Sequence, residues 1–267
     1  MTRRAGFVLV TALLAGCAVS QQQEIQMGEQ YSAQIAQQLP IIADPEINRY
    51  INVLGDSLAK LTSRADLDWH FSVVDSKEVN AFAIPGGYVY VNRGLIERVN
   101  TMNELAGVLG HEIGHVVKRH TVKQMQQSDR ANVGVVLLCS LTRVCSSQAG
   151  QAGIQVGAAA LFARFSRTDE AEADAEGVAN LVKAKIDPHG IPTMFQVLID
   201  ERKRRPEGVD AWFQTHPLEE DRIVATQEMI DRYTPAELLG FSKDSDNFQA
   251  FKRRIAALPP SPVPRSR

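Results

Sequence analysis

The chain of 267 residues is long enough to bury a sizeable core, and its 44% hydrophobic and 22% charged residues are typical of a globular protein. Its formal net charge of −2 indicates no strongly basic surface, such as nucleic-acid binding would require. The short mixed run of charges at residues 201–205 is better explained as the solvated face of a helix. Nucleic acid is therefore not expected among the partners.

Residues 1–16 have the features of a secretory signal peptide that is cleaved before Cys17. Two arginines precede an apolar stretch at residues 5–14, which is too short to span a bilayer as a helix. The stretch ends in Leu-Ala-Gly-Cys at residues 14–17, which resembles the lipobox of bacterial lipoproteins. We expect a lipid on Cys17 and an anchor at the periplasmic face of the outer membrane, since Ala18 is not acidic; the inner membrane is less favoured. An ordinary secretory signal with an incidental cysteine is the alternative.

Two further cysteines, Cys139 and Cys145, are separated by only five residues. Outside the cytoplasm such a pair tends to be oxidised, and a bridge between them needs a turn because they cannot face each other on one regular helix. The spacing predicts a disulfide that closes a turn. Two buried thiols are the alternative.

Helical patterns dominate the chain, with one short group of strands. The periodicity predicts helices over 21–39, 44–61, 102–126, 169–185, 190–204, 217–232 and 245–257, and strands over 69–74, 81–84 and 88–92. Asp44 is a suitable N-cap because Pro45 follows it in the first turn. The run Pro-Gly-Gly at residues 85–87 separates two of the strands as a turn. The predicted fold class is α+β, mainly helical, with one small sheet.

The sequence divides into several segments. Residues 17–43 form a linker and helix that lead from the anchor, and residues 44–257 form one domain. Within it, the apolar stretch at residues 131–163 predicts a packed helical hairpin, because its uninterrupted apolar runs are far shorter than the roughly 18 residues of a spanning helix. The proline-rich residues 258–267 are expected to be disordered.

The segment that carries most chemistry is His-Glu-Ile-Gly-His at residues 111–115. Histidines at i and i+4 lie on the same face of a helix, so His111 and His115 can bind one metal ion. Glu112 lies about 100° round the helix, where it can hold a water molecule as a general base. A core helix with merely hydrogen-bonded histidines is the alternative, but it would not call for this polar face.

The flanking residues of this helix support the interpretation. Thr101 with Glu104 three positions later predicts a capping box at the start. His120 falls on the opposite side of the helical wheel and is interpreted as structural. Glycines inside a helix are unfavourable, so we expect close approach by another backbone along one narrow stripe. The stripe consists of Gly107, Gly110 and Gly114.

A catalytic zinc site has three protein ligands and one open position, so a third ligand must come from elsewhere. On a helix at residues 169–185, Glu170 and Asp174 share a face with small and apolar residues, whereas Glu172 and Glu176 point to solvent. A buried carboxylate needs a cation, which favours Glu170 as the ligand. Asp174, one turn on, can accept a hydrogen bond from a ligand imidazole.

Four blocks of residues together resemble a known family. Residues 111–115, 170–174 and 80–91, with His216 before Pro217 and the later Arg222, are similar to the HtpX and type I CAAX-prenyl endopeptidase family of zinc metallopeptidases of the gluzincin class. More precisely, they resemble its soluble, periplasmic lipoprotein branch. The resemblance implies a gluzincin-type domain with an active-site helix and a small sheet. Its membrane segments and tetratricopeptide array are not recognised here, so prenylated substrates are not expected.

The resemblance also implies roles for individual residues. Glu170 would be the third ligand, and Arg222 would pair with an acidic group of the site. His216 would stabilise the oxyanion or occupy the open position in a resting state; from the sequence alone it could equally be a histidine at a helix start. Strand residues would receive an extended peptide by edge pairing. These residues are Asn80, Ala81 and Phe82.

The expected function is that of a zinc-dependent endopeptidase with one Zn²⁺ per chain, which cleaves misfolded or misassembled envelope proteins in the periplasm. Glu112 would act as the catalytic base. One alternative is a lipoprotein chaperone or assembly factor for outer-membrane proteins, with latent or secondary proteolysis. Another is a latent enzyme, in which His216 or the hairpin at residues 131–163 covers the metal.

Overall fold

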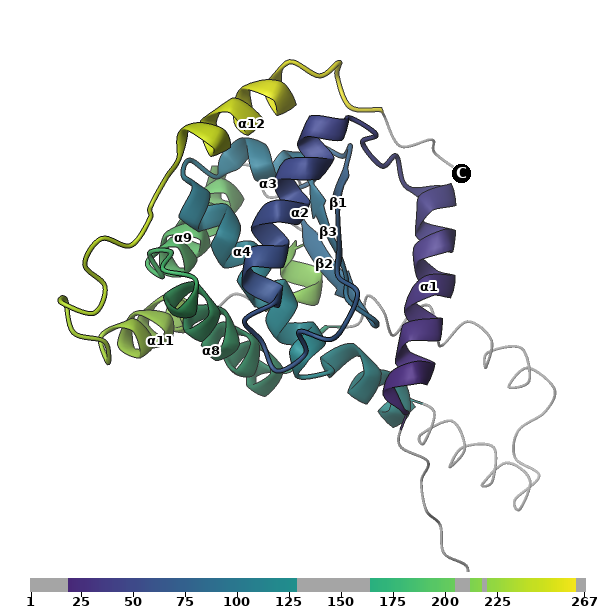
Figure 1. Ribbon diagram of the computed structural model, residues 1–267, viewed down its shortest axis with the longest axis horizontal. Helices are drawn as coiled ribbons and strands as arrows, with labels where there is room; N and C mark the ends of the chain where they lie inside the picture. The colour runs from purple at the N-terminus through teal and green to yellow at the C-terminus, as the bar shows by residue number, and fades with distance from the viewer. Residues whose placement is uncertain (1–18, 129–163, 205–211, 218–219, 263–267) are drawn as a thin grey trace, which may run out of the picture.

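A computed structural model of the chain describes residues 19–128, 164–204, 212–217 and 220–262 (Figure 1). Within these ranges it contains helices and one sheet of three strands, which confirms the predicted α+β, mainly helical class. The strands are β1 (His70–Val74), β2 (Ala81–Ile84) and β3 (Tyr88–Asn92). The helices are α1 (Gln21–Gln38), α2 (Pro45–Ala59), α3 (Arg93–Arg98), α4 (Met102–Val117), α8 (Arg167–Lys183), α9 (Gly190–Arg204), α11 (Glu220–Ile230) and α12 (Asp246–Ala256).

The sheet has the order β1-β3-β2, with β1 parallel and β2 antiparallel to β3. The turn between β2 and β3 uses Gly86 and Gly87, whose φ angles of 86° and 97° suit glycine. Because β2 pairs only with β3 in the described part of the chain, it is an edge strand.

Alternate residues of the strands face two different cores. Ala81, Ala83 and Val89 face the main core, which also contains Ile51 and Leu58 of α2. The other face carries a smaller cluster with Ile35 of α1, which lies on the opposite side of the sheet from α2 (Figure 1). The sheet residues of that cluster are Val74, Phe82, Ile84 and Tyr90.

Helix α4 lies in the centre of the molecule and is almost wholly buried, with α8 and α9 packed against it (Figure 1). A Cβ atom on Gly114 would lie 2.7 Å from the backbone oxygen of Ala173 in α8, and one on Gly110 would lie 3.4 Å from Cα of Gly177. The predicted close approach of another backbone along this glycine stripe is therefore confirmed.

The helix predicted over residues 102–126 is wrong at its C-terminal end. α4 ends at Val117, and Arg119 has a φ of 59°, a left-handed conformation that no helix interior adopts. A separate helical segment then runs over residues 120–128. His120 is therefore not on the helix of the other two histidines. The prediction that it lies on the opposite side of that helix does not apply.

The predicted capping box of α4 is also wrong. Thr101 is the N-cap but makes no side-chain cap hydrogen bond, and its hydroxyl donates to Asn103 instead. The Glu104 carboxylate accepts from the backbone N–H of Asn100, one residue earlier than a capping box requires, at 2.6 Å.

Residues 258–262, predicted as part of a disordered tail, pack against the domain. Arg93 donates to the carbonyl oxygen of Pro259 at 2.6 Å, and the hydroxyl of Ser261 donates to Asp75 at 2.6 Å. The proline content of this segment is therefore a poor predictor of disorder, since its backbone carbonyls still accept hydrogen bonds. No helix in the described ranges has the length and apolar character that crossing a bilayer demands.

Candidate metal centre

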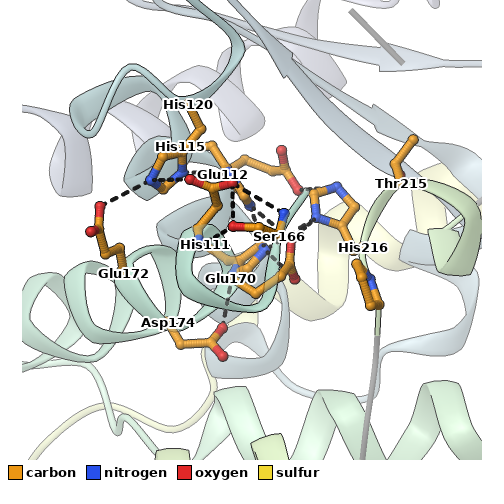
Figure 2. A network of polar contacts seen from close by, with 12 residues as sticks. His111, Glu112, His115, His120, Ser166, Glu170, Glu172, Asp174, Thr215 and His216 are labelled. Atoms are coloured by element: carbon orange, nitrogen blue, oxygen red, sulfur yellow. Dashed lines mark hydrogen bonds and ion pairs between the residues drawn. The ribbon is translucent and has the colours of Figure 1, made fainter. Parts of the chain in front are cut away.

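His111 and His115 lie one turn apart on α4, and both imidazoles are buried. Their Nε2 atoms face each other at 3.0 Å. Glu170 reaches them from α8, with its oxygens 3.7 Å from Nε2 of His111 and 3.5 Å from Nε2 of His115 (Figure 2). A fourth potential ligand atom comes from His216, so that all four ligand atoms lie within 4.8 Å of one another.

These residues fit a divalent cation such as zinc. Ligand atoms bound at about 2.0–2.1 Å around a tetrahedral zinc lie roughly 3.3 Å apart, close to the separations of 3.0 to 3.7 Å found between His111, His115 and Glu170. Asp174 lies 2.9 Å from Nδ1 of His111, so the proton of that imidazole is on Nδ1 and the Nε2 lone pair faces the cluster. A lone pair and a carboxylate directed at one buried point suit a cation between them.

Two carboxylates of α8 are joined by one guanidinium. Arg222 of α11 donates through Nε and Nη2 to the two oxygens of Asp174, at 2.8 and 2.7 Å. It also donates to Glu170. Because Asp174 contacts His111 and Glu170 faces the cluster, Arg222 orients both acidic partners of the site at once.

His216 lies between the acidic groups of the centre. Its Nδ1 is 3.1 Å from Glu170 and 3.4 Å from Nε2 of His111, while its Nε2 is 3.5 Å from Glu112. The indole of Trp212 stacks on the imidazole at 4.6 Å. No hydrogen bond from the described residues reaches Oε1 of Glu112, although this atom is buried. The carboxylate of Glu112 is thus free to accept a proton.

The electrostatics of the site separate the roles of its groups. Burial raises the pKa of Glu112, although His216 and His111 oppose the rise. Burial alone would also raise the pKa of Glu170, but the charge of His216 and the hydrogen bonds from His115 and His216 hold it well below the usual value. Burial holds the pKa of His115 well below its usual value, so that its imidazole is neutral at neutral pH. One carboxylate is suited to proton transfer and the other to binding a cation.

Three residues near the centre were not predicted to contact it. His120 lies 2.9 Å from His115, and Glu172, expected to be a solvated side chain, lies 3.1 Å from His120. Phe165 stacks on the imidazole of His115 at 4.0 Å. None of these contacts follows from regular helix spacing, because each crosses from one segment to another.

The strand residues expected to bind substrate lie on β2 and before it. The carbonyl of Asn80 accepts from Asn92, and Ala81 is fully buried against the main core. Phe82 points to the opposite face, where it stacks on Tyr90 at 4.9 Å. Cys17, Cys139 and Cys145 lie outside the described residues, as does the hairpin expected at residues 131–163.

The fold and the centre together define a metallopeptidase of the His-Glu-x-x-His type. Residues 45–230 match peptidase family M48, and the chain belongs to that family. It is 33% identical over 231 residues to the putative beta-barrel assembly-enhancing protease of Vibrio cholerae, covering 84% of this chain and 48% of the relative. It is 31% identical over 256 residues to the beta-barrel assembly-enhancing protease of Escherichia coli, covering 91% of this chain and 50% of the relative.

A mitochondrial relative is more distant. The chain is 29% identical over 185 residues to the human metalloendopeptidase OMA1, covering 65% of this chain and 34% of the relative. The chain spans about half the length of the bacterial relatives it matches, since 48% and 50% of those proteins are covered. The family match at residues 45–230 includes both histidines and Glu170.

Proposed function

We propose that the protein is a zinc-dependent endopeptidase in which His111, His115 and Glu170 hold one Zn²⁺ per chain. The observation that carries the proposal is the buried cluster of these three side chains beside Glu112, a carboxylate whose Oε1 accepts no hydrogen bond within the described ranges. A bound zinc ion supplies Lewis acidity, which polarises a peptide carbonyl and lowers the pKa of a water molecule toward neutrality.

The protein's own groups carry the proton steps. Glu112 takes a proton from the attacking water and passes it to the leaving amine, a role that its raised pKa supports. His216, whose Nε2 lies 3.5 Å from Glu112, donates to the oxygen on which negative charge develops. Asp174 and Arg222 act behind the ligands, because they hold His111 and Glu170 in orientation.

The proposed substrates are misfolded or misassembled envelope proteins. β2 is an edge strand that begins directly after Asn80 and contains Ala81 and Phe82, and an extended chain could pair along its open edge. Main-chain pairing tolerates varied sequences, as a quality-control protease requires. Two relatives are named as beta-barrel assembly-enhancing proteases, which supports outer-membrane proteins as clients.

The proposed location is the periplasmic face of the outer membrane. It is supported by the sequence of residues 1–16 and by the lipobox-like residues 14–17, in which Cys17 would carry the lipid. We also propose that Cys139 and Cys145 form a disulfide, which an oxidising compartment would allow.

The replacement of Glu112 by glutamine tests the activity. Glu112→Gln should retain the fold and one zinc per chain, because Glu112 is not a ligand, and should lose cleavage of an unfolded protein by about 100-fold or more. Zinc content and cleavage of a denatured casein, with and without chelator, measure both. Glu176→Gln, which alters only an ion pair with Lys118, is the control.

The same variant distinguishes a protease from an assembly factor, the alternative function. The names of the relatives also support an assembly factor that holds outer-membrane proteins with little proteolysis. If Glu112→Gln rescued an envelope defect as well as the wild type, holding clients would be the main role. Full cleavage activity in this variant would overturn the proposed mechanism.

A further inference from the structure

His120 lies directly behind the second histidine of the metal centre. The chain changes direction at Arg119, which has a left-handed conformation, and the buried ring of His120 contacts His115 of α4. Its Nδ1 is 2.9 Å from Nδ1 of His115, on the side of that imidazole which points away from the cluster (Figure 2). Its Nε2 is 3.1 Å from the carboxylate of Glu172 in α8.

In this series of contacts, the position of each proton follows from the two end groups, His115 and Glu172. His115 directs Nε2 at the cluster and can bind a cation only with a lone pair there, so its proton is on Nδ1. That N–H donates to Nδ1 of His120, which must then be the unprotonated nitrogen of a neutral ring. The proton of His120 is on Nε2, where Glu172 accepts it. Both N–H donors in this series of contacts therefore have an acceptor.

The arrangement parallels that of the first ligand. His111 has a carboxylate directly on its Nδ1, that of Asp174 at 2.9 Å. His115 has no carboxylate within hydrogen-bond distance of Nδ1 among the described residues, and reaches Glu172 through one intervening imidazole. Phe165, which stacks on His115 at 4.0 Å and lies 6.1 Å from His120, keeps both rings in place.

We propose that His120 and Glu172 are positioning residues, which orient His115 and raise its basicity as a metal ligand. The proposal rests on the zinc site described above. Groups that hydrogen-bond to metal ligands commonly contribute 10- to 100-fold in metal affinity. A purely structural histidine would contribute to folding but would leave the affinity of the folded protein for zinc unchanged.

Zinc affinity, measured by competition with a chromophoric chelator, tests the proposal without relying on activity. His120→Gln keeps a donor near the Nε2 position but loses the acceptor for His115, and we expect about 10- to 100-fold weaker binding. His120→Asn places Oδ1 near the Nδ1 position and should restore most of the affinity. Glu172→Gln, at a half-exposed side chain, should weaken binding by a few-fold.

The control is Glu176→Gln, on the same helix, which contacts Lys118 and should bind zinc like the wild type. The visible spectrum of the cobalt-substituted protein should change for His120→Gln and not for the control. Equal zinc affinity in the wild type, His120→Gln and Glu172→Gln would overturn the positioning role while leaving the metal site intact. A wild type that binds no zinc would overturn the metal site, and this role with it.

Discussion

Gly114 lies where α4, which carries His111 and His115, packs against α8, which carries Glu170. An added Cβ would be 2.7 Å from the backbone oxygen and 3.0 Å from Cα of Ala173, and backbone atoms cannot move aside as a side chain can. The absence of a side chain here lets Glu170, one turn before Ala173, reach the imidazoles. The residue type is therefore a requirement of the metal site as well as of the packing.

Gly114→Ala should destabilise the metal-free protein by about 1–3 kcal/mol, because the two helices must separate to admit the methyl group. Urea denaturation in the presence of chelator measures the free energy of unfolding. Gly110→Ala is the matched control, since its added Cβ would meet mainly the flexible tip of Leu181, at 2.9 Å. Comparable stability of the two variants would show that the helices do not depend on this contact.

One buried carboxylate connects helix α1 with the end of the active-site helix α4. Glu24 accepts from Nη1 and Nη2 of Arg64 at 2.7 and 3.1 Å, and from Nε of Arg119 at 2.8 Å. Arg64 also donates to the carbonyl oxygen of Val116, in the last turn of α4, at 3.0 Å. α1 thus takes part in stabilising the turn that positions His120.

Glu24→Gln should reduce the free energy of unfolding by roughly 3 kcal/mol, because it leaves the buried guanidinium of Arg64 without a compensating charge. Thermal and urea denaturation check this. Glu29→Gln, an exposed position on the same helix, should change stability by less than about 0.5 kcal/mol. A Glu24 variant as stable as the Glu29 variant would contradict the role of this ion pair.

Regular helices explain which parts of the site could be predicted. Periodicity alone places Glu170 and Asp174 on the buried face of α8, and the structure finds them there. His120 and Glu172 could not be assigned, because their contact depends on the end of α4 at Val117 and on the left-handed conformation of Arg119. Glu24 sits in a glutamine-rich run, where nothing marks one polar residue as buried.

Across the whole fold, the strands and most helices can be predicted from the alternation of apolar residues and from helix caps, since these signals depend only on neighbouring residues. The tertiary partners do not. Arg222 meets Asp174 across 48 positions of sequence, and His216 meets His111 across 105. Pairing over such distances is set by packing, and only a family motif or a structure reveals it.

The metal centre joins α4, α8 and the segment at residues 212–217, so removal of the ion should weaken the molecule as a whole. A ligand at about 1,000 times its Kd stabilises the native state by about 4 kcal/mol, which corresponds to a fall in Tm on the order of 10 °C when the wild type is treated with a chelator. Added zinc should restore the Tm in a concentration-dependent way. His111→Ala should show no such response, whereas Glu29→Gln, at an exposed position on α1, should keep it. A wild-type Tm that does not respond to chelator or zinc would contradict a structural coupling through the centre.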